Sequence, residues 1–130
     1  MKILGIGVDI VENKRFKKSI KNKKLIKRLF TLSEIKNSRL TKNKSSFFSK
    51  KFAAKESFSK AIGTGFRKDL NFKDIEILNN NLGKPYFKLS NKVKKIVVKT
   101  LKVKNFDLFL SISDEKDYSI AFTIIQVKNV

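Results

Sequence analysis

The stretch that most constrains the fold is KKFAAKESFSKAIGTG, which covers residues 50–65. It is carried by Ala, Lys, Glu and Phe, with no Gly or Pro before its end, and this predicts one helix. At about 100° per residue its apolar side chains fall on one broad arc, which is expected to face a core. Gly63-Thr64-Gly65 should end the helix and leave bare backbone beside it. The arc consists of Phe47, Phe48, Phe52, Ala54, Phe58, Ala61 and Ile62.

The charged residues of this helix admit two interpretations. Glu56 and Lys60 are neighbours at i and i+4, whereas Lys51 and Lys55 fall inside the apolar arc. In the first interpretation, Glu56 and Lys60 form a solvated pair that stabilises the helix by about 0.3–0.5 kcal/mol, and the other lysines extend to solvent. In the second, the carboxylate and the ammonium groups line a cleft that holds a metal ion and phosphates, which the glycine-bracketed turn also approaches.

The N-terminal residues 2–10 alternate as a β-strand. One face is apolar, and the other is nearly bare until it presents the carboxylate of Asp9 near the strand end. Asp9 either caps the helix that follows or belongs to a site. Two glycines on its face favour a site, because they weaken a strand and permit close approach. The apolar face is Leu4, Ile6, Val8 and Ile10, and the other face is Ile3, Gly5, Gly7 and Asp9.

The remaining segments predict further helices and antiparallel strands. Residues 11–29 predict a densely basic helix, with a break near Asn22 as an alternative, and Thr31 with Glu34 forms a capping box that starts a short helix. Together the segments predict an α+β fold with a mainly antiparallel sheet packed with helices. Strands are expected at 74–78, 86–89, 107–113 and 118–127, a loop or short turn at 66–72, and a helix after Ser90.

Length and composition restrict the class of protein. With 130 residues the chain is long enough for one core, so residues 1–130 are expected to form a single domain. The chain has no Cys and no His, which removes thiol chemistry, the commonest general base and the usual zinc ligand. No apolar run approaches about 20 residues, and the N-terminus does not resemble a signal peptide. A cytoplasmic protein is therefore expected.

The formal charge of +20, from 31 basic and 11 acidic residues, predicts a polyanionic partner. Nucleic acid, an acidic protein and a multiply phosphorylated small molecule all fit this charge. A small basic nucleic-acid-binding domain is therefore one hypothesis, since the 12 Phe side chains could stack on bases. Against it, most Phe residues fall on predicted core faces, and Asp9 and Glu56 would have no role.

Several segments together resemble the holo-acyl-carrier-protein synthases, a family of 4′-phosphopantetheinyl transferases. They appear in the family's order, with compatible spacing, over essentially the whole chain. The combination of VDI near the start with FAAKE, FSKA and GTG is highly specific. The segments are GIGVDIVENKRF (5–16), FTLSE (30–34), KFAAKESFSKAIGTG (51–65), DIEI (74–77), GKPY (83–86) and SIS (111–113).

The resemblance implies the fold and the activity of this family. Its members transfer the 4′-phosphopantetheine group from coenzyme A to a serine of apo-acyl carrier protein in fatty acid biosynthesis, release adenosine 3′,5′-bisphosphate and use Mg²⁺. The matching positions imply that Asp9 and Glu56 are metal ligands and that Lys60 lies by the reacting phosphates, so these three are the expected catalytic residues. Family members are commonly homotrimers with active sites at subunit interfaces.

The resemblance also implies two binding surfaces, one for coenzyme A and one for the acidic carrier protein. Lys51 stands at a position where the family usually has Arg. Lys keeps the positive charge but lacks the guanidinium group that binds an anion through two parallel hydrogen bonds. Asp114 stands where the family usually has His, and it adds negative charge near the phosphates unless it turns away and Lys116 substitutes for it. The expected coenzyme A residues are Lys51, Lys55, Lys60, Gly63, Thr64, Gly65 and Pro85, and the docking residues are Lys14, Arg15, Lys18 and Lys21.

Overall fold

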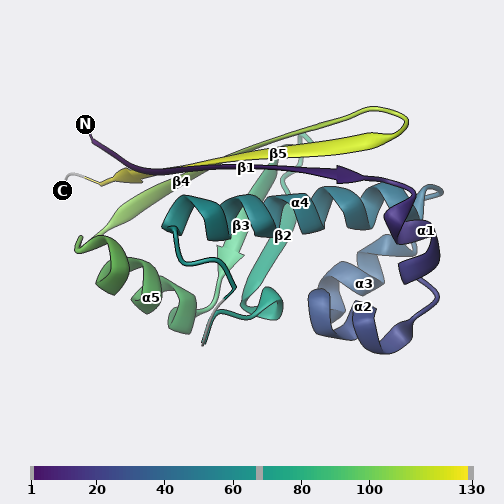
Figure 1. Cartoon of the computed structure of the whole chain (residues 1–130), viewed down its shortest axis with the longest axis horizontal. Coiled ribbons are helices and arrows are strands. Elements are labelled where there is room, and N and C mark those ends of the chain that lie inside the picture. The colour runs from purple at the N-terminus through teal and green to yellow at the C-terminus, as the bar shows by residue number, and fades with distance from the viewer. Residues whose placement is uncertain (1, 67–68, 129–130) are drawn as a thin grey trace.

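The computed structural model describes residues 2–66 and 69–128. A three-stranded antiparallel sheet and a two-stranded antiparallel hairpin lie on either side of one long helix, so the predicted α+β class is confirmed (Figure 1). Among the described residues, no helix is both long and apolar enough to cross a bilayer. The elements are β1 (Ile3–Glu12), α1 (Arg15–Ser19), α2 (Lys23–Leu29), α3 (Leu32–Ser38), α4 (Lys44–Ile62), the short 3₁₀ helix η1 (Phe72–Asp74), β2 (Ile75–Asn79), β3 (Pro85–Leu89), α5 (Asn91–Leu101), β4 (Phe106–Asp114) and β5 (Tyr118–Val127).

The three-stranded sheet has the order β1–β5–β4, and α4 lies along its inner face (Figure 1). The two glycines of β1 make this contact possible. A Cβ atom at Gly5 would overlap the backbone carbonyl of Ala61, and one at Gly7 would overlap that of Ser57. The expectation that these glycines serve a binding site is therefore corrected, because the close approach that they permit is that of a helix backbone.

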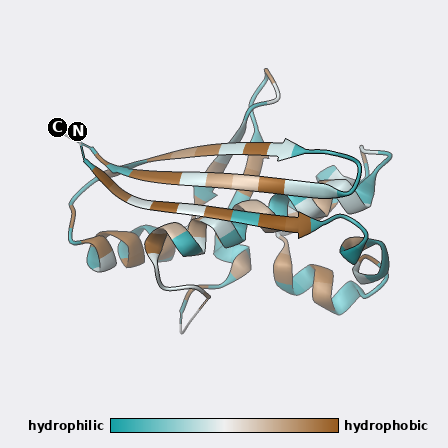
Figure 2. Ribbon diagram, turned by 45° about the horizontal axis from the view of Figure 1, so that its top comes forward, coloured by the Kyte–Doolittle hydropathy of each residue, from teal (hydrophilic) through white to brown (hydrophobic). Residues whose placement is uncertain are grey.

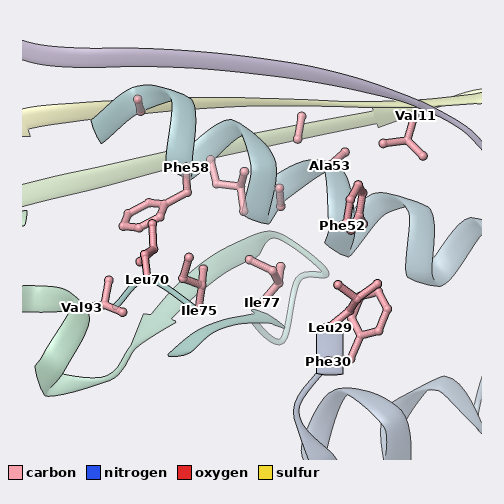
Figure 3. Packing of buried hydrophobic residues seen from close by; sticks show 14 of the residues in the cluster. Val11, Leu29, Phe30, Phe52, Ala53, Phe58, Leu70, Ile75, Ile77 and Val93 are labelled. Atoms are coloured by element: carbon pink, nitrogen blue, oxygen red, sulfur yellow. The ribbon is translucent and has the colours of Figure 1, made fainter. Parts of the chain in front are cut away.

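Helix α4 is buried on nearly all sides because it lies between two layers. The predicted apolar arc is confirmed in part: Phe58, for example, is fully buried and points toward Leu70, Ile75 and Val93 on the hairpin side (Figure 3). The opposite side is buried as well, against the sheet. There Ser57 Oγ lies 2.6 Å from Thr123 Oγ1 of β5, so a hydrogen bond links the helix to the central strand.

The outer face of the three-stranded sheet is apolar and exposed (Figure 2). Ile6, Val8 and Ile10 of β1 share this face as predicted, and their exposed fractions are 56%, 53% and 59%. Ile120 and Phe122 of β5 continue it, because they pair with Ile10 and Val8 across the sheet. We call these five residues the outer sheet face. None of the described elements covers it. Leu4, which was predicted on the same face, instead packs against the core, because the pairing of β1 is irregular between Ile3 and Gly5.

Most of the predicted elements are confirmed, with shifted ends. The N-terminal strand continues to Glu12. The basic segment 11–29 is broken where the alternative placed the break, and Asn22 caps α2 by accepting a hydrogen bond from the backbone N–H of Leu25. The capping box at α3 is present. The predicted loop 66–72 falls partly on residues 67–68, which lie outside the described residues.

Candidate active site

Asp9 and Lys60 meet where β1 and α4 run side by side. Lys60 Nζ lies 3.0 Å from Asp9 Oδ1 and donates a second hydrogen bond to the carbonyl oxygen of Val8 at 3.0 Å. Asp9 lies inside β1, which continues to Glu12 before α1 begins. It therefore does not cap that helix, and the interpretation of Asp9 as a site residue is favoured.

Glu56 is half-buried on α4, one turn before Lys60. Burial raises the pKa of its carboxyl group and the negative charge of Asp9 raises this pKa further, while Lys60 and Arg15 act in the opposite direction. Among the described residues, Lys60 makes its ion pair with Asp9 and not with Glu56. The interpretation as a solvated Glu56–Lys60 pair is therefore wrong, and two carboxylates interact electrostatically beside one ammonium group.

The two carboxylates fit a hard divalent cation. Their donor atoms are oxygens, and the repulsion that contributes to the raised pKa of Glu56 would be relieved by a positive ion. In the part of the chain that the structure describes, no group of three or more His, Cys, Asp or Glu residues gathers. Mg²⁺ is usually held by one or two carboxylates together with water and substrate phosphates, so two protein ligands are sufficient.

Lys55 is placed differently from its expected role in coenzyme A binding. Its side chain is fully buried, and Nζ donates to Glu34 Oε1 at 2.6 Å and to the carbonyl oxygens of Leu29 at 2.7 Å and Phe72 at 3.1 Å. Burial lowers the pKa of this ammonium group, while Glu34 raises it. An ammonium group has three donors, and all three are used inside the protein. Lys55 is therefore a structural residue in this chain.

Lys51 is also buried, but part of its ammonium group is available to a ligand. Nζ donates to the carbonyl oxygen of Ile77 at 2.7 Å and lies 4.7 Å from the centre of the Phe47 ring. Burial lowers the pKa of Lys51 to about 8. Lys51 lines a cavity of about 220 Å³ together with Ile77, Pro85 and Asp114, and we call this cavity the hairpin pocket.

Asp114 faces the hairpin pocket, where the expected negative charge is therefore present. Its Oδ2 accepts a long hydrogen bond from Ser46 Oγ at 3.4 Å. Lys116 lines a different cavity, next to the start of α1. The alternative in which Lys116 substitutes for Asp114 is therefore not what this structure has.

The glycine-bracketed turn after α4 lines a further cavity. Gly63 ends the helix in the left-handed conformation, with φ of 89°. Gly63 and Thr64 contribute to a cavity of about 560 Å³, whose other wall includes Ile96 and Thr100 of α5, and Gly65 follows with φ of 63°. Within one chain, the expected coenzyme A residues other than the buried Lys55 are thus distributed over the hairpin pocket, the turn beside this cavity and the Asp9–Lys60 contact.

The expected docking residues are exposed on and around α1. The guanidinium carbon of Arg15 lies 5.0 Å from the centre of the Phe52 ring, which is one turn of α4 before Glu56. This side of the expected docking surface therefore lies near Glu56. The residues expected to dock the carrier protein, all of them exposed, are Lys14, Arg15, Lys18 and Lys21.

The sequence interpretation missed the buried role of Glu34. The capping box predicts only that this side chain caps α3, and Oε1 does accept a hydrogen bond from the backbone N–H of Thr31 at 2.9 Å. The same carboxylate also binds Lys55 Nζ and the backbone N–H of Ile77, which are 21 and 43 residues away in sequence. No local pattern signals contacts over such separations.

Comparisons with known proteins identify the family. Residues 5–123 match the model of the 4′-phosphopantetheinyl transferase superfamily. A holo-[acyl-carrier-protein] synthase from Pelagibacter ubique (strain HTCC1062) is 62% identical over 98% of this chain and 100% of its own length. The structure of the Neisseria meningitidis holo-[acyl-carrier-protein] synthase is similar with a TM-score of 0.84 and 34% identity, covering 96% of this chain and 99% of that one. The structure of the Bacillus anthracis holo-(acyl-carrier-protein) synthase in complex with CoA (3′,5′-ADP) is similar with a TM-score of 0.80 and 33% identity. This match covers 97% of this chain and 98% of that one. The chain therefore belongs to the 4′-phosphopantetheinyl transferase superfamily.

Proposed function

We propose that this protein transfers the 4′-phosphopantetheine group from coenzyme A to a serine of apo-acyl carrier protein, giving holo-acyl carrier protein and adenosine 3′,5′-bisphosphate in fatty acid biosynthesis. The observation that carries the proposal is the contact of Lys60 with Asp9 beside Glu56, on the scaffold of this superfamily. Relatives named holo-[acyl-carrier-protein] synthase, one of them solved with CoA, support it. We further propose that residues 1–130 act as one domain. A cytoplasmic location stays a prediction.

The alternative, a small nucleic-acid-binding domain, is not favoured. Ten Phe side chains belong to the core or pack against it, which leaves few rings to stack on bases. Asp9 and Glu56 would have no role in it. The positive surface instead suits docking of an acidic carrier protein. The buried or partly buried rings are Phe16, Phe30, Phe47, Phe48, Phe52, Phe58, Phe66, Phe72, Phe87 and Phe106.

Asp9 and Glu56 are the residues that would hold Mg²⁺. A bound ion would supply positive charge that neutralises the pyrophosphate of coenzyme A. Phosphoryl transfer depends mainly on positioning and charge neutralisation, and Lys60 contributes to both because its ammonium group is exposed and held in place by Asp9. Glu56, whose pKa is raised, is suited to accept the proton of the attacking serine hydroxyl.

We propose a homotrimer with active sites between subunits, and the outer sheet face supports association of protomers. Contiguous exposed apolar surface on a soluble protein generally marks an interaction site. A second protomer packed on this face would cover apolar side chains that each protomer leaves exposed. The distribution of the expected coenzyme A residues over separate surfaces of one chain also agrees with sites that two protomers complete.

The proposed transfer is tested by the mass of apo-acyl carrier protein after incubation with this protein, coenzyme A and Mg²⁺. We expect a gain on the order of 340 Da, the size of the phosphopantetheine group, that requires a divalent metal. The same mixture with EDTA is the control. Absence of the gain with several carrier proteins would rule out the transferase.

Reversing the charge of Arg15 and Lys18 should raise the KM for the carrier protein and leave the KM for coenzyme A nearly unchanged. These exposed residues belong to a rim that meets an acidic partner, and rim charges act mainly on encounter with that partner. Steady-state kinetics with each substrate varied in turn measures both constants. Equal rises in the two constants would argue against a separate docking surface.

The KM for coenzyme A should rise as the pH increases through about 8, the pKa to which burial lowers Lys51. Below this pH the ammonium group is charged and attracts an anionic ligand in the hairpin pocket, and above it this charge is lost. In Lys51→Arg the charge persists across the range, so that part of the pH dependence should disappear. Steady-state kinetics of the wild type and of Lys51→Arg at several pH values measures the KM for coenzyme A. An identical pH dependence of this KM in the two proteins would exclude Lys51 as the origin of the pH dependence.

A further inference from the structure

One edge of the β2–β3 hairpin has no neighbouring strand in the described structure, since β2 pairs only with β3. At this edge the backbone N–H of Ile77 donates to Glu34 Oε2 at 2.9 Å. The carbonyl oxygen of the same residue accepts from Lys51 Nζ at 2.7 Å. Charged side chains thus satisfy both backbone groups of a buried residue, where another strand would otherwise be needed.

Glu34 joins this strand edge to α3 and α4. Its Oε1 accepts from the backbone N–H of Thr31 at 2.9 Å and from Lys55 Nζ at 2.6 Å. Lys51 and Lys55 are one turn apart on α4, and Glu56 follows directly. Both partners in the Glu34–Lys55 pair are fully buried, so water does not compete for these contacts. The three charged side chains therefore hold β2 against the helix that carries Glu56.

Two parts of this network also line the hairpin pocket, namely Lys51 and Ile77. A shift of β2 would move this wall of the pocket directly. We propose that Glu34 is a positioning residue for the transfer reaction, which holds β2 against α4 so that the hairpin pocket keeps its shape. That coenzyme A is the ligand of the pocket rests on the proposed function. The hydrogen bond from the Ile77 N–H to Glu34 does not depend on that function.

Glu34→Gln removes the hold on Ile77 with little change in side-chain shape. A carboxamide has one acceptor oxygen, and Lys55 Nζ and the Thr31 N–H both require it. The amide NH₂ group would then face the N–H of Ile77, so two donors would oppose each other. We expect hydrogen exchange of the Ile77 amide, measured by NMR and divided by that of Thr123 in β5, to accelerate at least ~10-fold.

A kinetic measurement distinguishes positioning from simple stabilisation. In Glu34→Gln we expect the KM for coenzyme A to rise about tenfold, with kcat and the carrier-protein KM changed less than about threefold. The matched control is Val97→Ala, which leaves a cavity under α5 and lowers the unfolding temperature without touching the hairpin pocket. The control should leave both the normalised Ile77 exchange and the KM values at their wild-type levels.

Should Glu34→Gln fail to fold, the double variant Glu34→Leu/Lys55→Met replaces the buried pair by apolar side chains, leaves the Ile77 N–H without a side-chain acceptor and serves for the same measurements. Unchanged exchange at Ile77, or an equal rise in the KM for coenzyme A in Val97→Ala, would overturn the proposal. A wild-type protein that transfers no phosphopantetheine would overturn the proposed function instead. The exchange experiment would then still decide whether Glu34 holds β2.

Discussion

Asp9→Asn and Glu56→Gln should each lower turnover at least ~100-fold, which is the scale of losing a main electrostatic stabiliser of a transition state. Asp9 loses the charge that pairs with Lys60 at 3.0 Å, and Glu56 loses a carboxylate whose raised pKa suits it to accept a proton. If both carboxylates bind one metal ion, the double variant should be little worse than either single one, because residues that act as a unit are not additive. Rates of holo-carrier-protein formation measure all three variants.

Neither substitution should unfold the protein, because each removes one of two mutually repelling carboxylates. Thermal unfolding checks this. The matched control is Asp107→Asn on β4, which makes the same chemical change at a half-exposed carboxylate away from Lys60 and should keep wild-type turnover. Near-normal turnover in Asp9→Asn would remove Asp9 from the site.

Val8→Asp should convert the proposed homotrimer to monomers and reduce transfer at least ~100-fold, because small misplacements of catalytic groups can cost that much. Val8 lies on the outer sheet face, opposite Phe122. Association would bury an unpaired carboxylate among apolar side chains, which is strongly unfavourable. Sedimentation equilibrium measures the change, since one chain has a mass of 15.0 kDa and the trimer three times that.

Leu40→Asp is the matched control for Val8→Asp. Leu40 follows α3 and is 87% exposed, so the same charge is introduced at an apolar residue that lies off the sheet. The control should retain both the trimer mass and the activity. A monomeric Val8→Asp with full activity would show that the active sites do not require the interface, and a monomeric wild type would exclude the trimer itself.

Helix ends and strands were predictable from the sequence because their causes are local. Ser90 accepts a hydrogen bond from the backbone N–H of Val93, and Thr31 with Glu34 forms both bonds of a capping box. These contacts satisfy backbone groups within three residues, so a short segment of sequence contains all the participants. The alternating strands were predictable for the same reason, since the pleat itself sets their period.

The roles of the buried lysines were not predictable because they depend on distant segments. The arc pattern treats a helix as having one buried face, but layers pack on both sides of α4 and enclose Lys55 completely. Its partner Glu34 is 21 residues away. Lys60 likewise reaches Asp9, 51 residues away, in preference to Glu56 one turn before it. The resemblance to a known family assigned Asp9, Glu56 and Lys60 to one site. The ion pair between Asp9 and Lys60 is known only from the structure.

The direct packing of the α4 backbone against Gly5 and Gly7 limits which parts of this enzyme can change without loss of activity. No side chain lies between the two backbones there. The distance between the strand that carries Asp9 and the helix that carries Glu56 therefore cannot be adjusted by exchanging one side chain for another. A residue larger than Gly at either position would push the helix away and carry Glu56 and Lys60 with it. Changes in preference for the phosphopantetheine donor are therefore expected to accumulate in the β2–β3 hairpin. The distance between Asp9 and Glu56, the proposed catalytic carboxylates, should stay constant among variants that remain active.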